Sequence, residues 1–175
     1  GGLYSTGDNT VTESIFEDNE ADNGGGIVVA GNASLALNDT IVRNNRAVNG
    51  YGGGLLVSDQ ASATVTGVLS IDANGLATTG TTRFESNTAG QDGGAIASHG
   101  STSVMANGVL FQGNRAGDDG GGVATLEASR AVIENSNFEN NLAAQNGGGL
   151  YSNHFGADIP GGDKAVVDNS RFINN

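Results

Sequence analysis

Two short stretches carry the side chains best suited to catalysis. A histidine stands between a serine and a glycine at Ser98-His99-Gly100, and two adjacent carboxylates follow at Asp118-Asp119. Enzymes use such groups to transfer protons and to cleave glycosidic bonds, provided that two carboxylates face each other across the substrate. The stretches therefore raise the hypothesis of an enzyme that acts on polysaccharides.

The surrounding sequence counts against this hypothesis. Ser98-His99-Gly100 resembles a short motif of the polygalacturonases, and Asp118-Asp119 resembles their paired acids. In that family the paired acids precede the histidine, and a later basic motif is missing here. A polysaccharide lyase would need a basic residue beside an acidic calcium site, but the 7 lysines and arginines are scattered. We therefore predict that the chain is not an enzyme and keep a polysaccharide lyase or hydrolase as an alternative.

Metal and cofactor sites find little support in the sequence. There is no cysteine, and His99 and His154 have no matched spacing, which disfavours zinc. The nonapeptide repeat that binds calcium is absent. Turn chemistry explains most of the aspartates, which would bind calcium only weakly at the surface. These aspartates are Asp8, Asp18, Asp92, Asp118, Asp119 and Asp163. No cofactor is predicted.

A repeat of about 27 residues positions all of these side chains. Phe84, Phe111 and Phe138 lie 27 residues apart, and each is followed three residues later by an asparagine. An alanine, a polar turn, paired glycines and an aliphatic residue then follow. The aromatic column comprises Phe16, Val42, Phe84, Phe111, Phe138 and Phe172. The asparagine column comprises Asn19, Asn45, Asn87, Asn114, Asn141 and Asn175.

Two further apolar columns precede the aromatic one, at a spacing of two residues that indicates strands rather than helices. The first contains Leu35, Ala77, Val104, Ala131 and Ala165, and the second contains Val11, Leu37, Ala106, Ile133 and Val167. One such unit cannot bury its apolar side alone, so copies must stack at about 4.8 Å per rung. We predict an all-β fold for residues 1–175: a single-stranded, right-handed parallel β-helix of about six rungs. Phenylalanine should then stack on phenylalanine, and the asparagines should form an amide ladder.

Two features of the repeat suggest where binding would occur. Extra residues lie near 58–80 and 153–163, and insertions in a solenoid emerge as loops that often bind ligands. A surface loop without function is the alternative. The residue after the aliphatic column should point outward, and this row is less polar than a solvated face. A lateral contact or a local reversal of inside and outside would explain the row, which includes Tyr4, Val28, Leu56 and Tyr151.

The repeat motifs themselves resemble a known family. Gly93-Gly94-Ala95-Ile96 and Phe84-Glu85-Ser86-Asn87 are similar to the GGA[ILV] and FxxN motifs of the chlamydial polymorphic membrane proteins and of related bacterial surface β-helix repeats. The likeness covers the whole chain, although Val42 replaces a phenylalanine. It implies an extracellular or cell-surface location associated with the outer membrane. The implied role is a non-catalytic shaft or adhesive passenger, as in autotransporters. A self-assembling subunit of an extracellular fibre is the alternative.

Charge and repeat phase suggest the partners. The net charge of −12 argues against nucleic acid and anionic membrane surfaces. No apolar run approaches the roughly 20 residues of a membrane helix, so this segment should not insert into a membrane. A host or cell-surface ligand is expected instead. Because Gly1-Gly2-Leu3 and Phe172 to Asn175 each fall within a repeat, further rungs of the same chain or like subunits are expected at both ends.

Overall fold

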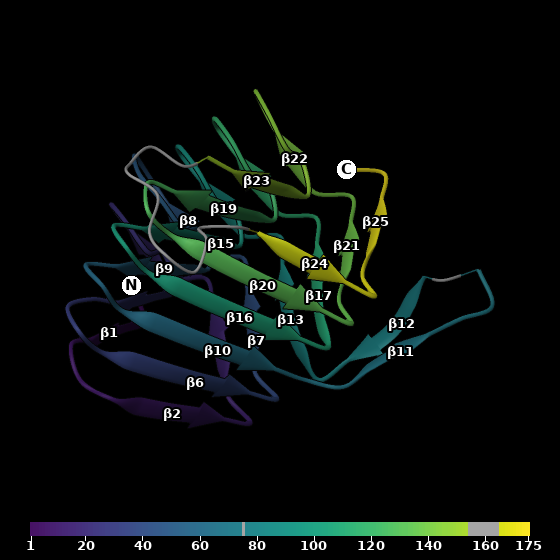
Figure 1. The fold of residues 1–175 in the computed structure, drawn as a ribbon, viewed down its shortest axis with the longest axis horizontal. Coiled ribbons are helices and arrows are strands. Elements are labelled where there is room, and N and C mark those ends of the chain that lie inside the picture. Colours follow the sequence, from purple (N-terminus) through teal and green to yellow (C-terminus); the bar gives the residue numbers. More distant parts are fainter. Residues whose placement is uncertain (75, 154–164) are drawn as a thin grey trace.

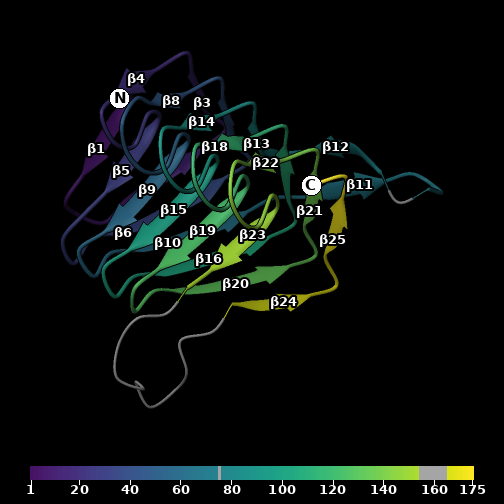
Figure 2. The same ribbon diagram turned by 90° about the horizontal axis from the view of Figure 1, so that it is seen from above.

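The computed structural model describes residues 1–74, 76–153 and 165–175. Every regular element in this part of the chain is a β-strand, and all but two of the strands form four parallel sheets that run along a solenoid of about six rungs (Figure 1). The prediction of a parallel β-helix is thereby confirmed. Seen from above, the rungs follow one another as successive turns of the chain (Figure 2).

The first and second sheets contain six strands each. The first comprises β1 (Leu3–Ser5), β5 (Ile27–Val29), β9 (Leu55–Ser58), β15 (Ile96–His99), β19 (Val123–Leu126) and β23 (Leu150–Ser152). The second comprises β2 (Asn9–Thr12), β6 (Ser34–Asn38), β10 (Ser62–Thr66), β16 (Ser103–Asn107), β20 (Arg130–Glu134) and β24 (Val166–Asp168).

The third sheet carries the aromatic column, and the fourth carries the alanines. The third comprises β3 (Ile15–Glu17), β7 (Ile41–Arg43), β13 (Thr82–Glu85), β17 (Val109–Gln112), β21 (Asn137–Glu139) and β25 (Arg171–Ile173). The fourth comprises β4 (Glu20–Ala21), β8 (Arg46–Ala47), β14 (Thr88–Ala89), β18 (Arg115–Ala116) and β22 (Leu142–Ala143). Each strand pairs in parallel with its counterpart one repeat away, so equivalent residues lie above one another.

The core is a set of apolar columns inside the solenoid. Phe84, Phe111 and Phe138 are completely buried, and Val42 occupies the same column between Phe16 and Phe84. The ring centroids of Phe84 and Phe111 are 5.5 Å apart, and those of Phe111 and Phe138 are 4.5 Å apart. Leucine, isoleucine, valine and alanine side chains from the first and second sheets complete the core. Phe172 also stacks on Phe138 but remains 44% exposed in the last rung.

The assignment of Ala77 to an apolar column of the second sheet is wrong. Ala63 of β10 occupies that place and pairs with Val104 of the next rung. Ala77 lies instead in an antiparallel hairpin formed by β11 (Leu69–Ile71) and β12 (Ala77–Gly80). The spacing before Phe84 points to Ala77 only because the hairpin is inserted between β10 and the strand β13 that carries Phe84. The hairpin projects from the third rung (Figures 1 and 2). Within the range 58–80, the regular strand β10 comes first and the hairpin follows it.

The corner between the fourth and first sheets requires glycine because backbones approach closely there. A Cβ atom added at Gly94 would lie 2.3 Å from the carbonyl oxygen of Gly121 and 2.6 Å from the backbone nitrogen of Arg115. Both obstacles are main-chain atoms that cannot move aside. The preceding Gly93 adopts a φ of +69°, which turns the chain back onto the first sheet.

In the middle rungs, the residues after the aliphatic column lie on the outer side of the first sheet but are buried, so the expectation of an exposed apolar row is wrong there. Leu56 is only 8% exposed, and the equivalent Ala97 and Ala124 are fully buried. The cause is the glycine turn, which folds over the outer side of the first sheet: a Cβ atom at Gly24 would lie 3.3 Å from Cβ of Leu56. Tyr4 in the first rung is 70% exposed, whereas Val28 and Tyr151 are half-buried. A row that the chain itself covers offers no continuous lateral contact.

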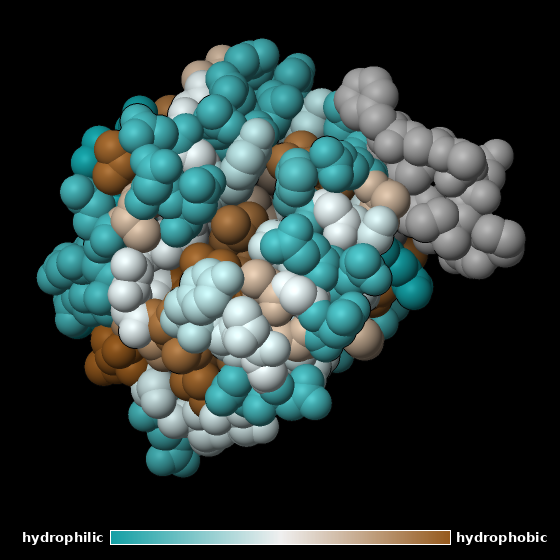
Figure 3. All heavy atoms as spheres, turned by 90° about the vertical axis from the view of Figure 1, so that its left-hand side faces the viewer, coloured by the Kyte–Doolittle hydropathy of each residue, from teal (hydrophilic) through white to brown (hydrophobic). Residues whose placement is uncertain are grey.

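The first rung presents apolar side chains at its open edge. Leu3, Val11 and Phe16 pack against the core but are only partly buried, and Ile15 is exposed. Figure 3 views the side of the molecule where β1 and β2 lie and shows apolar residues reaching the surface between polar ones. In the described residues, no helix is long and apolar enough to cross a membrane.

Candidate functional site

The asparagine column is a continuous ladder of hydrogen bonds. Asn114 is completely buried, and its Nδ2 donates to the carbonyl oxygen of Phe84 at 2.9 Å and to Oδ1 of Asn141 at 2.9 Å. Its own Oδ1 accepts from the backbone nitrogen and the Nδ2 of Asn87, both at 3.0 Å. The same pattern connects the column from Asn19 to Asn175. The amides therefore satisfy one another and the corner backbone, which leaves the buried ones no capacity for a ligand.

The Ser98-His99-Gly100 stretch does not form a catalytic arrangement. Ser98 points into the core, is fully buried and shares a hydrogen bond with the Thr102 hydroxyl. His99 points outward; its ring stacks on Tyr51 with centroids 5.5 Å apart, and Nε2 lies 3.2 Å from a carboxylate oxygen of Glu127. Because Ser98 and His99 occupy opposite faces of β15, the histidine cannot activate the serine.

The paired aspartates hold neighbouring turns together. Oδ1 of Asp119 accepts hydrogen bonds from the backbone nitrogen and Nδ2 of Asn146, at 2.8 and 2.9 Å. Asp118 accepts a hydrogen bond from Nε2 of Gln145 at 2.7 Å. One rung earlier, Oδ1 of Asp92 accepts from the backbone nitrogen of Asp119 at 2.8 Å. The carboxylates thus link one rung to the next and do not face each other across a substrate-sized gap.

The charged form of Asp92 is destabilised in this turn. Partial burial raises its pKa; the backbone N–H of Asp119 opposes the rise, and the carboxylates of Asp119 and Asp118 add to it. A carboxyl group whose pKa is raised by folding contributes stability at low pH and loses it as the pH rises through the folded-state pKa. Asp92 therefore destabilises the folded chain at neutral pH relative to a neutral residue of the same shape.

Replacing Asp92 by asparagine should consequently stabilise the protein at neutral pH. Asparagine occupies the equivalent turn position at Asn23 and Asn146, and its side-chain oxygen can keep the hydrogen bond to Asp119. Thermal melts should show a higher Tm for Asp92→Asn at pH 7 and a gain that shrinks towards pH 3, where carboxyl groups become protonated. A gain of equal size at both pH values would refute the electrostatic origin.

No group of three or more histidine, aspartate or glutamate side chains in residues 1–74, 76–153 and 165–175 is arranged to hold a metal ion. Asp8 instead accepts hydrogen bonds from the backbone and hydroxyl of Ser34, at 3.0 and 2.7 Å. His154 and Asp163, together with the insertion near 153–163, lie outside the described residues apart from Asn153.

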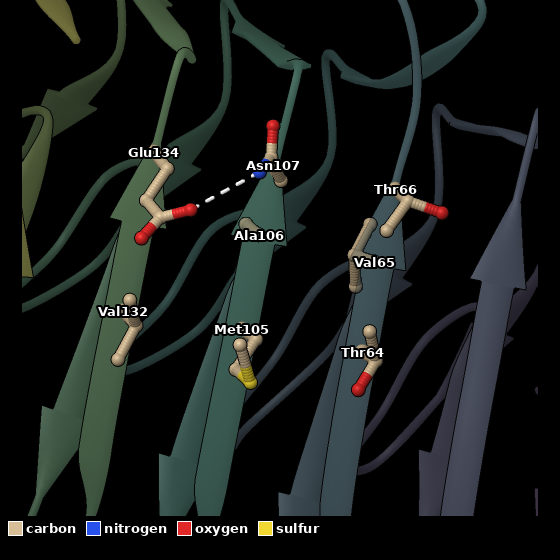
Figure 4. A pocket seen from close by; sticks show the side chains of 8 residues that line it. All are labelled: Thr64, Val65, Thr66, Met105, Ala106, Asn107, Val132 and Glu134. Atoms are coloured by element: carbon tan, nitrogen blue, oxygen red, sulfur yellow. Dashed lines mark hydrogen bonds between the residues drawn. The ribbon is translucent and has the colours of Figure 1, made fainter. Parts of the chain in front are cut away.

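The outer face of the second sheet contains a shallow groove (Figure 4). Met105 and Val132 lie side by side on neighbouring strands, and Thr64 lies on the next strand. Glu134 is the one carboxylate in the lining, and it accepts a hydrogen bond from Asn107 at 3.1 Å. The volume of about 120 Å³ is below the roughly 300 Å³ of typical ligand pockets. The lining has a single carboxylate and therefore no pair of acids, and it contains no histidine or lysine to activate the hydroxyl groups of Thr64 and Thr66.

Comparison with known proteins bears on the corner that contains the ladders. Residues 81–99 and 135–153 match the family model of the Chlamydia polymorphic membrane protein repeat. These two stretches resemble chlamydial polymorphic membrane protein repeats. Each runs from the third sheet through the fourth to the first, and so includes a core phenylalanine, a ladder asparagine and the glycine corner. No curated protein and no solved structure matches the chain significantly.

The match confirms the resemblance read from the sequence for these two stretches, and this repeat family supports a location at the cell surface. It is a family of non-enzymatic surface proteins. Asp118-Asp119 lie in the rung between the two matched segments, and the equivalent turn residues Gln91-Asp92 and Gln145-Asn146 lie within them.

Sequence reasoning missed one residue that shapes the surface. Glu139 is only 3% exposed, and its Oε1 accepts a hydrogen bond from the backbone nitrogen of Ala77 at 2.7 Å. Gln112 donates to the other carboxylate oxygen at 3.2 Å. Glu139 therefore anchors the inserted hairpin to the third sheet. No local signal identifies it, because Glu85 occupies the same column without being buried.

Proposed function

We propose that this chain is a non-catalytic module of a bacterial cell-surface protein, serving as a rigid shaft or adhesive passenger. The observation that carries the proposal is the match of two rung corners to a polymorphic membrane protein repeat, in a solenoid whose polar side chains are used to join rungs. A stack of rungs extends a chain away from a surface and displays inserted loops on its sides.

Surface exposure can be tested on intact cells. Antibodies raised against the folded segment should label unpermeabilised cells of the organism that encodes it, and external protease should remove the label. An antibody to a cytoplasmic protein provides the control for cell integrity. Labelling that appears only after permeabilisation would overturn the proposed location.

We expect the chain to be inert towards polysaccharides. Incubation with pectin or alginate should release neither reducing ends nor unsaturated products, because Ser98 is buried and Asp118 and Asp119 are engaged by the next turn. Parallel assays of His99→Ala and Asp118→Asn separate contaminants from intrinsic activity. Product release by the parent that either substitution abolishes would restore the enzyme alternative.

A second role, assembly into a fibre, is favoured by the edges of the end rungs. Among the described residues, β24 and β25 each pair with a strand on one side only, and Val167 and Phe172 are 42% and 44% exposed. Unpaired strand edges with apolar residues are templates for further strands. We propose that they are covered by further rungs of the same polypeptide or by a stacked copy, which adds head to tail because the asparagine ladder has a direction.

The isolated 175-residue chain should therefore associate end to end as its concentration rises. Light scattering should show a mass that increases with concentration, and Val167→Lys should reduce this increase by placing a charge on the edge. Thr64→Lys, on the exposed outer face of β10, is the matched control and should leave association unchanged. A constant monomer mass across the whole concentration range would contradict the proposal.

A further inference from the structure

The inserted hairpin forms one wall of a groove on the side of the solenoid. β11 and β12 project from the third rung beside the third sheet (Figures 1 and 2). The groove is lined by Leu69, Ile71, Asn135, Asn137, Asn169 and Arg171 and has a volume of about 180 Å³. It lies on the lateral face, and two of its lining residues, Asn169 and Arg171, belong to the last rung.

The groove is held in shape by contacts at the base of the hairpin. Glu139 binds the backbone of Ala77, as described above, and Leu110 beneath the hairpin is only 5% exposed. Thr81 donates from its backbone nitrogen to the carbonyl oxygen of Val68 at 3.0 Å, which closes the base of the hairpin. The wall is thus fixed before any ligand arrives, which reduces the entropy lost on binding.

The two walls differ in chemistry. Leu69 and the exposed Ile71 present an apolar side, whereas the opposite side presents amides and a guanidinium group. Nδ2 of Asn169 donates to Oδ1 of Asn135 at 2.6 Å, so the amides form an ordered surface row. One apolar wall with a few fixed polar groups is the composition of a small-ligand site.

Charge distinguishes this groove from the rest of the molecule. The chain carries 19 acidic and 7 basic residues, yet the lining contains an arginine and no carboxylate. Among the described residues, Arg171 forms no ion pair, a property that it shares with Arg115 and Arg130. Glu139 lies outside the lining, and its oxygens already accept three hydrogen bonds. An exposed guanidinium without a partner can bind a carboxylate or sulfate through two hydrogen bonds.

We propose that this groove binds an acidic saccharide unit. Arg171 would receive the carboxylate or sulfate, the exposed amide of Asn169 would bind an adjacent hydroxyl group, and Ile71 would contact the C–H face of the ring. The volume of about 180 Å³ is also below the roughly 300 Å³ of typical ligand pockets, so the groove holds at most one sugar of a longer chain. This site goes beyond the proposed structural role, which would stand even if the groove bound nothing.

The site can be tested by titrating the 175-residue chain with glucuronate and with a sulfated heparin disaccharide and following the binding by NMR or calorimetry. Comparing the two ligands distinguishes recognition of a carboxylate from recognition of a sulfate. Arg171→Ala should weaken binding about tenfold or more, as expected for loss of a charge-assisted pair. Arg130→Ala removes another exposed arginine without an ion pair among the described residues, and it should leave the affinity unchanged. Ile71→Asn should also weaken binding while leaving the circular dichroism spectrum intact.

Four results would overturn the proposal. The first is that the parent chain binds neither saccharide at millimolar concentration, and the second is that Arg171→Ala and Arg130→Ala lose the same affinity. The third is that neutral glucose binds as tightly as the acidic saccharides. The fourth is that a glutamate-rich peptide binds more tightly than either saccharide. The last result would assign the groove to an acidic protein segment. Surface labelling of cells is independent of all four, so failure of the site and failure of the proposed location can be told apart.

Discussion

Replacing Phe111 by alanine is expected to lower the free energy of unfolding by about 3–5 kcal/mol. The ring is completely buried and lies between Phe84 and Phe138 at centroid distances of 5.5 and 4.5 Å. Strands fixed by hydrogen bonds on both sides cannot collapse into the space that the ring leaves, so most of the cavity should persist. Thermal unfolding should therefore occur roughly 10 °C below that of the parent.

Phe172→Ala provides the matched control. The same ring type stacks on Phe138 with centroids 4.5 Å apart, but no second ring among the described residues stacks on its other face, and it is 44% exposed. Its loss removes less buried area and leaves an opening that water can enter. We expect less than half the effect of Phe111→Ala. Equal effects, or an unchanged midpoint for Phe111→Ala, would show that the aromatic stack does not govern stability.

The fold could be predicted because the constraint is local and repeated. The 27-residue spacing of Phe84, Phe111 and Phe138, with an asparagine always three residues later, allows neighbouring copies to meet only in register. The structure places equivalent residues above one another, and Val42 substitutes within the column without breaking it. A pattern that recurs in every rung averages out such departures.

The surface was less predictable because it depends on contacts that the repeat does not encode. Strand alternation correctly predicts that the side chain of Leu56 lies on the outer side of the sheet, but it does not predict the glycine turn that covers this side. Burial of Glu139 follows from a hairpin inserted 62 residues earlier in the chain. The candidate groove combines that hairpin with strands of the last two rungs, and only the folded chain brings them together.

The asparagine ladder should be nearly as important as the aromatic stack. In Asn114→Ala, the backbone N–H of Asn87 and the carbonyl oxygen of Phe84 both lose their side-chain partner while buried. Each buried group left without a partner costs roughly 1–3 kcal/mol, so a total loss of about 3 kcal/mol is expected in denaturant unfolding. Asn49→Ala, which removes an exposed hydrogen bond to Asp22, should change the stability by less than about 0.5 kcal/mol.

Asn114→Asp tests whether the ladder depends on the donors of the amide or on its shape. The carboxyl oxygen can still accept from Asn87, but an ionised group cannot donate to the carbonyl oxygen of Phe84 or to Oδ1 of Asn141. Burial and these two facing oxygens should raise the pKa of the new group in the folded state. A raised folded-state pKa means that the protonated form is favoured by folding, so stability is retained at low pH and lost as the pH rises through that pKa. The variant should thus recover part of the stability of the parent near pH 4, where its single O–H replaces one of the two donations, and should lose it towards pH 7, whereas the deficit of Asn114→Ala should stay constant. A deficit of Asn114→Asp that does not change with pH would show that the site is open to water and that the ladder does not depend on amide donors.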